Sequence, residues 1–219
     1  MKLAVDLDST LSHTIPAALR TLNSELGTSY TIKDVTSFSA WEVLPALRDH
    51  PKGRDKFYRS LDKAWEDWQS IEIELGAVEA MRRLKNAGLQ IDIVTGRSTT
   101  PRDVLESWLR LHGIPYDNLI VTEAKPGEER RTSELKTDLP YDIWIDDNPY
   151  MATAIKNQPE KLLLLFYQPW NRDIPNGPNV VRVYGWQDTL RKLGLGPTTG
   201  PAGRRPNSNK RVRRYSRHI

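Results

Sequence analysis

Strands that alternate with helices constrain this chain more than any other feature, because that alternation permits few sheet topologies. From residue 75 to residue 193, short apolar runs are separated by segments with helical periodicity. Ile91–Val94 and Leu162–Phe166 are almost continuously apolar, which is typical of strands buried on both faces of a sheet. The predicted strands are Lys2–Val5, Gln90–Val94, Asn118–Val121, Asp142–Ile145, Lys161–Tyr167 and Val180–Val183. We therefore predict an α/β fold, a doubly wound parallel sheet with helices on both faces.

Residues 13–72 follow a different pattern, with helical periodicity and no strand signal. Phe57, Leu61, Ala64 and Trp65 recur at helical spacing, which indicates an amphipathic helix. We expect a small helical cap inserted after the first strand. The chain then divides into a core of residues 1–12 and 73–193, a cap of residues 13–72 and a tail of residues 194–219.

Two further expectations concern the core. Thr99 or Thr100 should cap a helix that has Pro101 in its first turn. A polar loop should follow the predicted strand that ends at Val121.

The net charge of +4 arises in the tail. Residues 197–219 contain seven Lys or Arg and no acid, which leaves 25 basic against 28 acidic residues in the remainder. The remainder therefore lacks the basic balance of a nucleic-acid-binding fold, and we expect at most weak nucleic-acid contact, through the tail. Because the tail is rich in Gly and Pro and poor in apolar residues, we expect it to be disordered.

The sequence also excludes several classes of protein. It contains no cysteine, which rules out disulfides, thiolate chemistry and thiolate zinc sites. No apolar run reaches the roughly 18–20 residues of a membrane span, and the N-terminus is predicted to be a core strand rather than a signal peptide. We expect a cytoplasmic protein with no membrane partner, and the sequence carries no signal for the oligomeric state.

Acidic and polar residues follow three of the predicted strands, at the sheet edge where doubly wound folds bind ligands. Paired carboxylates repel each other unless a cation or a shared proton lies between them, and a hard divalent cation with oxygen ligands is the simplest answer. A hydroxyl group and a glycine at a strand-to-helix turn suit phosphate binding. These residues are Asp6 and Asp8 after the first strand, Thr95 and Gly96 after the strand at Gln90, and Asp146 and Asp147 after the strand at Asp142, with Lys125 and Lys136 between the last two groups.

In this order the motifs resemble those of the haloacid dehalogenase-like (HAD-like) phosphohydrolases. The matching stretches are Asp6-Leu7-Asp8-Ser9-Thr10, Thr95-Gly96-Arg97, a lysine, and Asp146-Asp147. Residues 1–193 are further similar to the 5'(3')-deoxyribonucleotidases of the cytosolic type C family. That similarity rests on the position of the cap, on Lys136 ten residues before Asp146, and on a C-terminal signature made of Phe166–Arg172, Arg182, Val183 and Trp186. Ser9 is a departure, because most relatives carry glycine there.

The resemblance implies a HAD-like Rossmannoid core and a Mg²⁺-dependent phosphatase that hydrolyses (deoxy)nucleoside monophosphates through an aspartyl-phosphate. Asp6 would be the nucleophile, and Asp8 would serve as general acid and then general base. The implied metal ligands are Asp6, the backbone carbonyl of Asp8, Asp147, and Asp146 through water. The implied phosphate-binding residues are Thr95, Gly96 and Lys136.

Some assignments stay open at the level of sequence. Lys136 is preferred to Lys125 on spacing alone, and Arg97 fits a surface or capping residue as well as a ligand. Phe38 and Trp41 are the candidate substrate-binding aromatics, because they lie off the amphipathic stripe in a polar context, although such residues often form the core of a cap. The alternatives to a nucleotidase are a polynucleotide end phosphatase, which the basic tail favours, a phosphatase of another small phosphate ester, and a non-enzymatic binding protein on the same scaffold.

Overall fold

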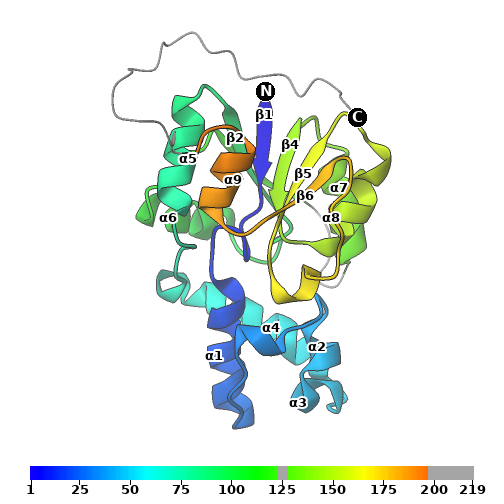
Figure 1. The fold of residues 1–219 in the computed structure, drawn as a ribbon. Coiled ribbons are helices and arrows are strands. Elements are labelled where there is room, and N and C mark those ends of the chain that lie inside the picture. The colour runs from blue at the N-terminus through cyan, green and yellow to red at the C-terminus, as the bar shows by residue number, and fades with distance from the viewer. Residues whose placement is uncertain (123–127, 197–219) are drawn as a thin grey trace, which may run out of the picture.

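A parallel six-stranded sheet forms the centre of the computed structural model, which describes residues 1–122 and 128–196 (Figure 1). The strands lie in the order β3-β2-β1-β4-β5-β6, and every neighbouring pair is parallel. They are β1 (Lys2–Val5), β2 (Gln90–Thr95), β3 (Asn118–Val121), β4 (Ile143–Asp146), β5 (Leu162–Phe166) and β6 (Val180–Val183). The order reverses at β1, so the predicted doubly wound topology is confirmed.

Side-chain alternation along the strands gives each face of the sheet its own apolar core. Leu3 and Val5 of β1 belong to the larger core, whereas Ala4 belongs to a smaller one with Trp144 and Leu163. The larger core also contains buried residues of α5 (Ala77–Asn86), α6 (Arg102–Leu111) and α9 (Trp186–Lys192). The smaller core takes residues from α8 (Pro149–Ala154) and η3 (Ile155–Asn157), and α7 (Glu129–Thr137) packs against α8.

Helices make up the segment between β1 and α5, and this segment lies beyond the carboxyl ends of the strands, in the lower half of Figure 1. Its elements are α1 (Thr14–Leu26), η1 (Ile32–Asp34), α2 (Ala40–Val43), α3 (Pro45–Arg48), α4 (Gly53–Glu66) and η2 (Trp68–Ser70). α1 packs along α4, and Gly27 ends α1 in the left-handed conformation with φ 63°.

The two connections between this segment and the sheet run side by side. Ser12 forms a bridge with Ile73, the His13 amide donates to the Glu72 carbonyl at 2.8 Å, and the Glu74 amide donates to the Leu11 carbonyl at 2.7 Å. Such a paired connection is what the division into a core (1–12 and 73–193) and a cap (13–72) requires, and we retain that division as a proposal.

Two local predictions were wrong. The stretch predicted as a polar loop after Val121 contains the helix α7. Neither Thr99 nor Thr100 caps α6, because Pro101 occupies the N-cap position and the Thr99 hydroxyl donates to Asp62 Oδ1 at 2.8 Å instead.

The predicted disordered tail begins at residue 194, and its residues 197–219 lie outside the described part of the chain. Within residues 1–122 and 128–196, no helix has the length and apolar character needed to cross a membrane.

Candidate active site

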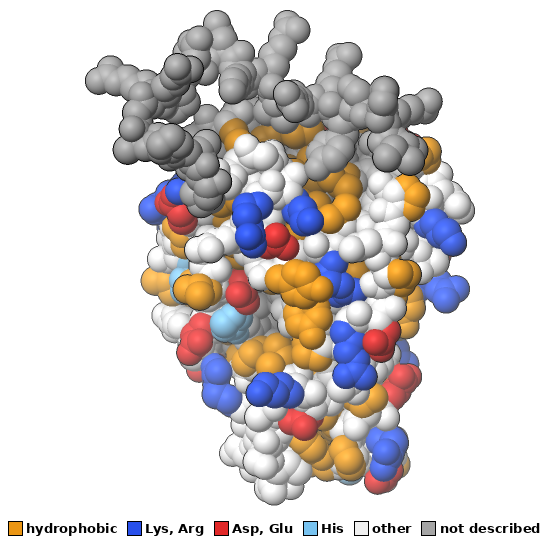
Figure 2. Space-filling model, in the orientation of Figure 1, with side chains coloured by type: hydrophobic (Ala, Val, Ile, Leu, Met, Phe, Trp, Pro, Cys, Tyr) orange, Lys and Arg blue, Asp and Glu red, His pale blue; other side chains and the backbone are white. Residues whose placement is uncertain are grey.

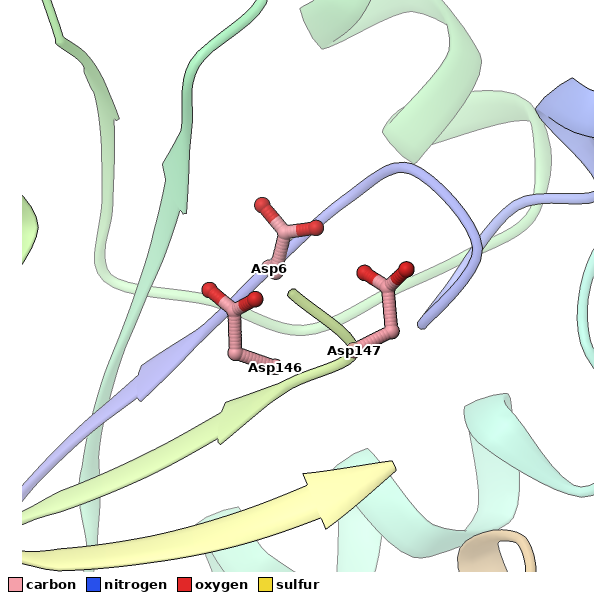
Figure 3. Close-up of side chains that lie close together, drawn as sticks. All are labelled: Asp6, Asp146 and Asp147. Atoms are coloured by element: carbon pink, nitrogen blue, oxygen red, sulfur yellow. The ribbon is translucent and has the colours of Figure 1, made fainter. Parts of the chain in front are cut away.

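Three carboxylates meet at the carboxyl ends of the two central strands (Figure 3). Asp6 follows β1, Asp146 ends β4, and Asp147 comes next. The Asp6 amide extends the β1–β4 ladder by donating to the Ile145 carbonyl at 2.9 Å. One oxygen of each carboxylate lies within 4.8 Å of the others, and the three residues are only 7%, 0% and 3% exposed. One acid of the first predicted pair and both acids of the second thus form one buried cluster, although the two pairs are far apart in the sequence.

Lys136 of α7 reaches into this cluster. Its ammonium donates to Asp6 Oδ1 at 2.6 Å and to Asp146 Oδ2 at 2.7 Å. Burial disfavours the charged form, but the negative charges of Asp146 and Asp6 outweigh it, so the pKa of Lys136 is raised above its ordinary value. The structure therefore brings Lys136 to the predicted place, whereas Lys125 lies outside the described residues.

One ammonium does not neutralise three carboxylates. Burial raises the pKa of Asp6 to about 7, with Asp146 and Asp8 adding to the rise and Lys136 opposing it. Burial together with the charges of Asp6 and Asp146 also raises the pKa of Asp147 well above its ordinary range. No cation pairs with Asp147 in the part of the chain that the structure describes. A divalent cation fits this site, because it would supply the missing positive charge to hard oxygen donors.

The Asp8 side chain stands apart from the three-carboxylate cluster. Its Oδ1 accepts from Thr14 Oγ1 at 2.5 Å and from Trp65 Nε1 at 3.2 Å, and its Oδ2 accepts from Arg97 Nε at 2.7 Å. The Arg97 side chain is only 8% exposed and lies over the Trp65 ring at 5.6 Å. It also approaches Asp62 of α4 at 3.8 Å. Arg97 is thus a buried partner of Asp8, a role that sequence reasoning did not single out.

The turn after β2 lies beside the cluster. Thr95 is buried at the end of β2, and its Oγ1 accepts from the Arg97 amide at 3.2 Å. Gly96 leaves no room for a side chain, since a Cβ there would stand 2.6 Å from Cγ2 of Thr132 on α7. Both residues line the same cavity as Asp6, Asp8 and Lys136. The structure therefore brings all the predicted catalytic and phosphate-binding residues around one cavity.

Aromatic side chains form part of the wall of this cavity. Phe38, Phe57 and Tyr58 of the helical segment line it. Phe38 also meets Trp170 of the core edge-on, with ring centroids 6.4 Å apart. Trp41 does not line the cavity; it packs on Phe57 at 6.0 Å and on Tyr58 at 5.4 Å. Of the two aromatics predicted to bind substrate, Phe38 therefore lies at the cavity and Trp41 does not.

Ser9 has φ 61°, the one positive φ among the described non-glycine residues. Its amide donates to the Ser12 carbonyl at 2.8 Å, and its carbonyl accepts from Gln168 Nε2 at 2.7 Å. A left-handed backbone explains why glycine suits this position, and the small Ser9 side chain is accommodated.

Comparisons with known proteins agree with this arrangement. A family model described as "5' nucleotidase, deoxy (Pyrimidine), cytosolic type C protein" matches residues 1–193. A protein from Oceanobacillus iheyensis that carries the name of a nucleotidase is 25% identical over 194 residues, which cover 87% of this chain and 98% of that protein.

Solved structures share the fold at lower identity. Protein tyrosine kinase A of Mycobacterium tuberculosis aligns with a TM-score of 0.63 and 14% identity, over 88% of this chain and 98% of its own. A HAD family hydrolase from Deinococcus radiodurans, solved with bound phosphate and sodium, aligns with a TM-score of 0.53 and 16% identity, over 90% of this chain and 97% of its own.

Proposed function

The chain belongs to the family of 5' nucleotidase, deoxy (pyrimidine), cytosolic type C proteins, and from that premise we propose that it hydrolyses (deoxy)nucleoside monophosphates with Mg²⁺ as its cofactor. Membership makes it a phosphoric monoester hydrolase of the 5'-nucleotidase type on a HAD-like fold. The observation that carries the proposal is the buried cluster of Asp6, Asp146 and Asp147 around Lys136. The cytosolic family description also supports the predicted cytoplasmic location.

The proposed reaction has two halves. An oxygen of the Asp6 carboxylate attacks phosphorus, and the bond between phosphorus and the ester oxygen breaks. Asp8 enters this step as the neutral acid and gives its proton to the departing alkoxide, which leaves Asp8 as a carboxylate. Asp8 then takes a proton from a water molecule that attacks the aspartyl-phosphate, so inorganic phosphate leaves and the Asp6 carboxylate is restored.

The remaining polar groups would hold the phosphoryl group. When bound, Mg²⁺ would neutralise negative charge on the phosphoryl oxygens. The groups proposed to hold Mg²⁺ are Asp6, Asp147 and the backbone carbonyl of Asp8, with Asp146 acting through water. The proposed phosphate-binding groups are the Lys136 ammonium, the Thr95 hydroxyl and the Gly96 amide. The lining of one cavity by these residues supports the assignment.

A nucleoside base would lie against the aromatic wall. Phe38, Phe57 and Tyr58 line the cavity together with the carboxylates. Base-to-aromatic stacking is worth about 1–3 kcal/mol per base. We therefore propose Phe38 as a base-contacting residue, and we no longer propose Trp41.

A polynucleotide end phosphatase is the second candidate, because the seven Lys or Arg of residues 197–219 could follow a phosphate backbone. The surface of the described residues gives this candidate no support. The face drawn in Figure 2 mixes basic and acidic side chains and shows no region of a single sign. A non-enzymatic role on this scaffold is disfavoured by the retention of both acid pairs and Lys136.

A panel of phosphate esters tests the proposal. The purified protein would be assayed with Mg²⁺ and with chelator, on deoxy- and ribonucleoside monophosphates, sugar phosphates and a 5'-phosphorylated oligonucleotide. We expect Mg²⁺-dependent release of phosphate, fastest from a nucleoside monophosphate. Preference for the oligonucleotide would establish the second candidate, and hydrolysis that persists in chelator would overturn the metal assignment.

A further inference from the structure

A short stretch after β5 contacts both loops that carry the carboxylates. Gln168 and the one-turn helix η4 (Pro169–Asn171) form it. Gln168 Nε2 donates to the Ser9 carbonyl at 2.7 Å, beside the first acid pair. Asn171 Nδ2 donates to the Asp147 carbonyl at 2.8 Å, and Trp170 Nε1 donates to Asp147 Oδ2 at 3.0 Å. These contacts join strands far apart in the sequence at the point where the cluster forms.

Trp170 is the donor that orients the Asp147 carboxylate. The two short bonds of Lys136 go to Asp6 and Asp146. Among the described residues, no other side chain donates to the carboxylate of Asp147. The indole N–H engages Oδ2, which leaves Oδ1 able to face a cation. Trp170 itself is 9% exposed, so its ring has little freedom to move away.

Arg182 of β6 fixes the position of η4 through several hydrogen bonds. Its guanidinium donates to Asn171 Oδ1 at 2.8 Å, to the Asn171 carbonyl at 2.7 Å and to the Ile174 carbonyl at 2.5 Å. Arg182 is 8% exposed, and no acid forms an ion pair with it in residues 1–122 and 128–196. A buried cation costs free energy unless its donors are satisfied. Here neutral acceptors of one loop satisfy them, so the charge serves to fix the shape of that loop.

We propose that Trp170 is a positioning residue for the divalent-metal site, acting through the Asp147 carboxylate, and that Arg182 supports it by fixing η4. The proposal rests on the metal site of the proposed function. Groups that orient metal ligands typically change metal affinity 10- to 100-fold when removed. Trp170 therefore contributes to affinity for the cation rather than to the chemical step.

Trp170→Phe tests this with little loss of volume, because it removes the N–H and keeps an aromatic ring. The matched control is Trp108→Phe, since the buried Trp108 donates its indole N–H to the Ile71 carbonyl at 2.9 Å, away from the carboxylates. Mg²⁺ binding would be measured by calorimetry without substrate, since Trp170 also lines the substrate cavity. Circular dichroism would verify that each variant is folded.

We expect Trp170→Phe to bind Mg²⁺ about 10- to 100-fold more weakly, and its kcat to recover as Mg²⁺ is raised. Trp108→Phe should bind like the wild type. Arg182→Lys keeps the charge but loses the forked geometry, so it should weaken Mg²⁺ binding too, and it decides the matter if Trp170→Phe does not fold. An unchanged Mg²⁺ dissociation constant in the folded variant overturns this proposal alone. A wild type that binds no divalent cation overturns the metal site of the proposed function as well.

Discussion

Replacing Asp6 with asparagine should abolish hydrolysis and, at the same time, stabilise the protein in the absence of divalent metal. The change removes the proposed nucleophile while keeping nearly the same volume. It also removes one negative charge from a buried cluster in which Lys136 is the cation that contacts the carboxylates. A structural aspartate with a favourable ion pair would show the opposite effect on stability.

The pKa of Asp6 sets the magnitude. Burial raises it from 3.8 to about 7, so between these pH values the folded state binds more protons than the unfolded state. The unfolding free energy of the metal-free wild type therefore falls as the pH rises from about 4 to about 7. Asparagine does not titrate, so the Asp6→Asn variant does not lose this free energy. At pH 8 the shift corresponds to about 4 kcal/mol. Relaxation of the neighbouring carboxylates reduces this, so we expect a gain of about 2–4 kcal/mol, or roughly 4–16 °C in Tm.

Thermal unfolding in chelator at several pH values from 4 to 8 would measure this difference. The matched control is Asp92→Asn. Asp92 is also buried, but its carboxylate accepts from Tyr141 Oη at 2.7 Å and from Asn118 Nδ2 at 2.9 Å, so asparagine there should not stabilise. If Asp6→Asn were less stable than the wild type at pH 8, the bond from Lys136 would outweigh the repulsion and our electrostatic reasoning would fail. Retained turnover in the folded variant would refute the nucleophile assignment.

Three other predictions concern Lys136, Phe38 and Ser9. Lys136→Met leaves the buried carboxylates without their ammonium, so the metal-free protein should lose about 3–5 kcal/mol of unfolding free energy. Urea titrations should show this loss and a larger stabilisation by Mg²⁺ than in the wild type, and an unchanged urea midpoint would contradict the prediction. Phe38→Ala should lower kcat/KM for nucleotides roughly 5- to 150-fold and lower that for an aryl phosphate less, whereas Trp41→Ala should change kcat/KM for both substrates alike. If Phe38→Ala lowered kcat/KM equally for both substrates, Phe38 would contribute only to packing and not to base binding. Ser9→Gly should keep the unfolding free energy within about 1 kcal/mol, but Ser9→Val, β-branched at positive φ, should lower it; equal stability of the two variants would refute strain at Ser9.

The sheet was predictable because its strands carry their own signal. Strands buried on both faces are short apolar runs, and the predicted bounds of Lys2–Val5, Asn118–Val121 and Val180–Val183 are those of the structure. Parallel strands also share one edge, so the residues after each strand could be placed together before any coordinates were known. This is why the acid pairs and Thr95–Gly96 were found from sequence.

The helix α7 escaped prediction because its buried face is polar. Periodicity detects a helix by its apolar stripe, yet Ser133, Lys136 and Thr137 are the buried residues here, while Leu135 is only partly buried. Lys136 of that face bonds to Asp6 and Asp146, and the Thr137 hydroxyl bonds to the Glu134 carbonyl, so these buried polar groups have partners. The apolar periodicity that reveals most helices is therefore absent from α7, the helix that carries Lys136.

The partners of the carboxylates were hidden for a different reason. Arg97 pairs with Asp8, which stands 89 residues earlier. Trp170, which follows β5, donates to Asp147, which stands 23 residues earlier. Neither pairing leaves a local pattern, since hydrogen-bond partners are set by the packing of separate elements. Family resemblance marked the stretch that contains Trp170 but gave its residues no role.

The order of the site residues along the chain also sets the order in which they are synthesised. Lys136 follows Asp6 by 130 residues, which takes roughly 7–26 s at a ribosomal rate of about 5–20 residues per second. During that interval β1 can pair with β2, but its other edge stays open until β4 emerges. A chain that terminates before β4 would hold a central strand with one unpaired edge and only one of the three clustered carboxylates, that of Asp6. Such truncated products should aggregate rather than retain partial activity.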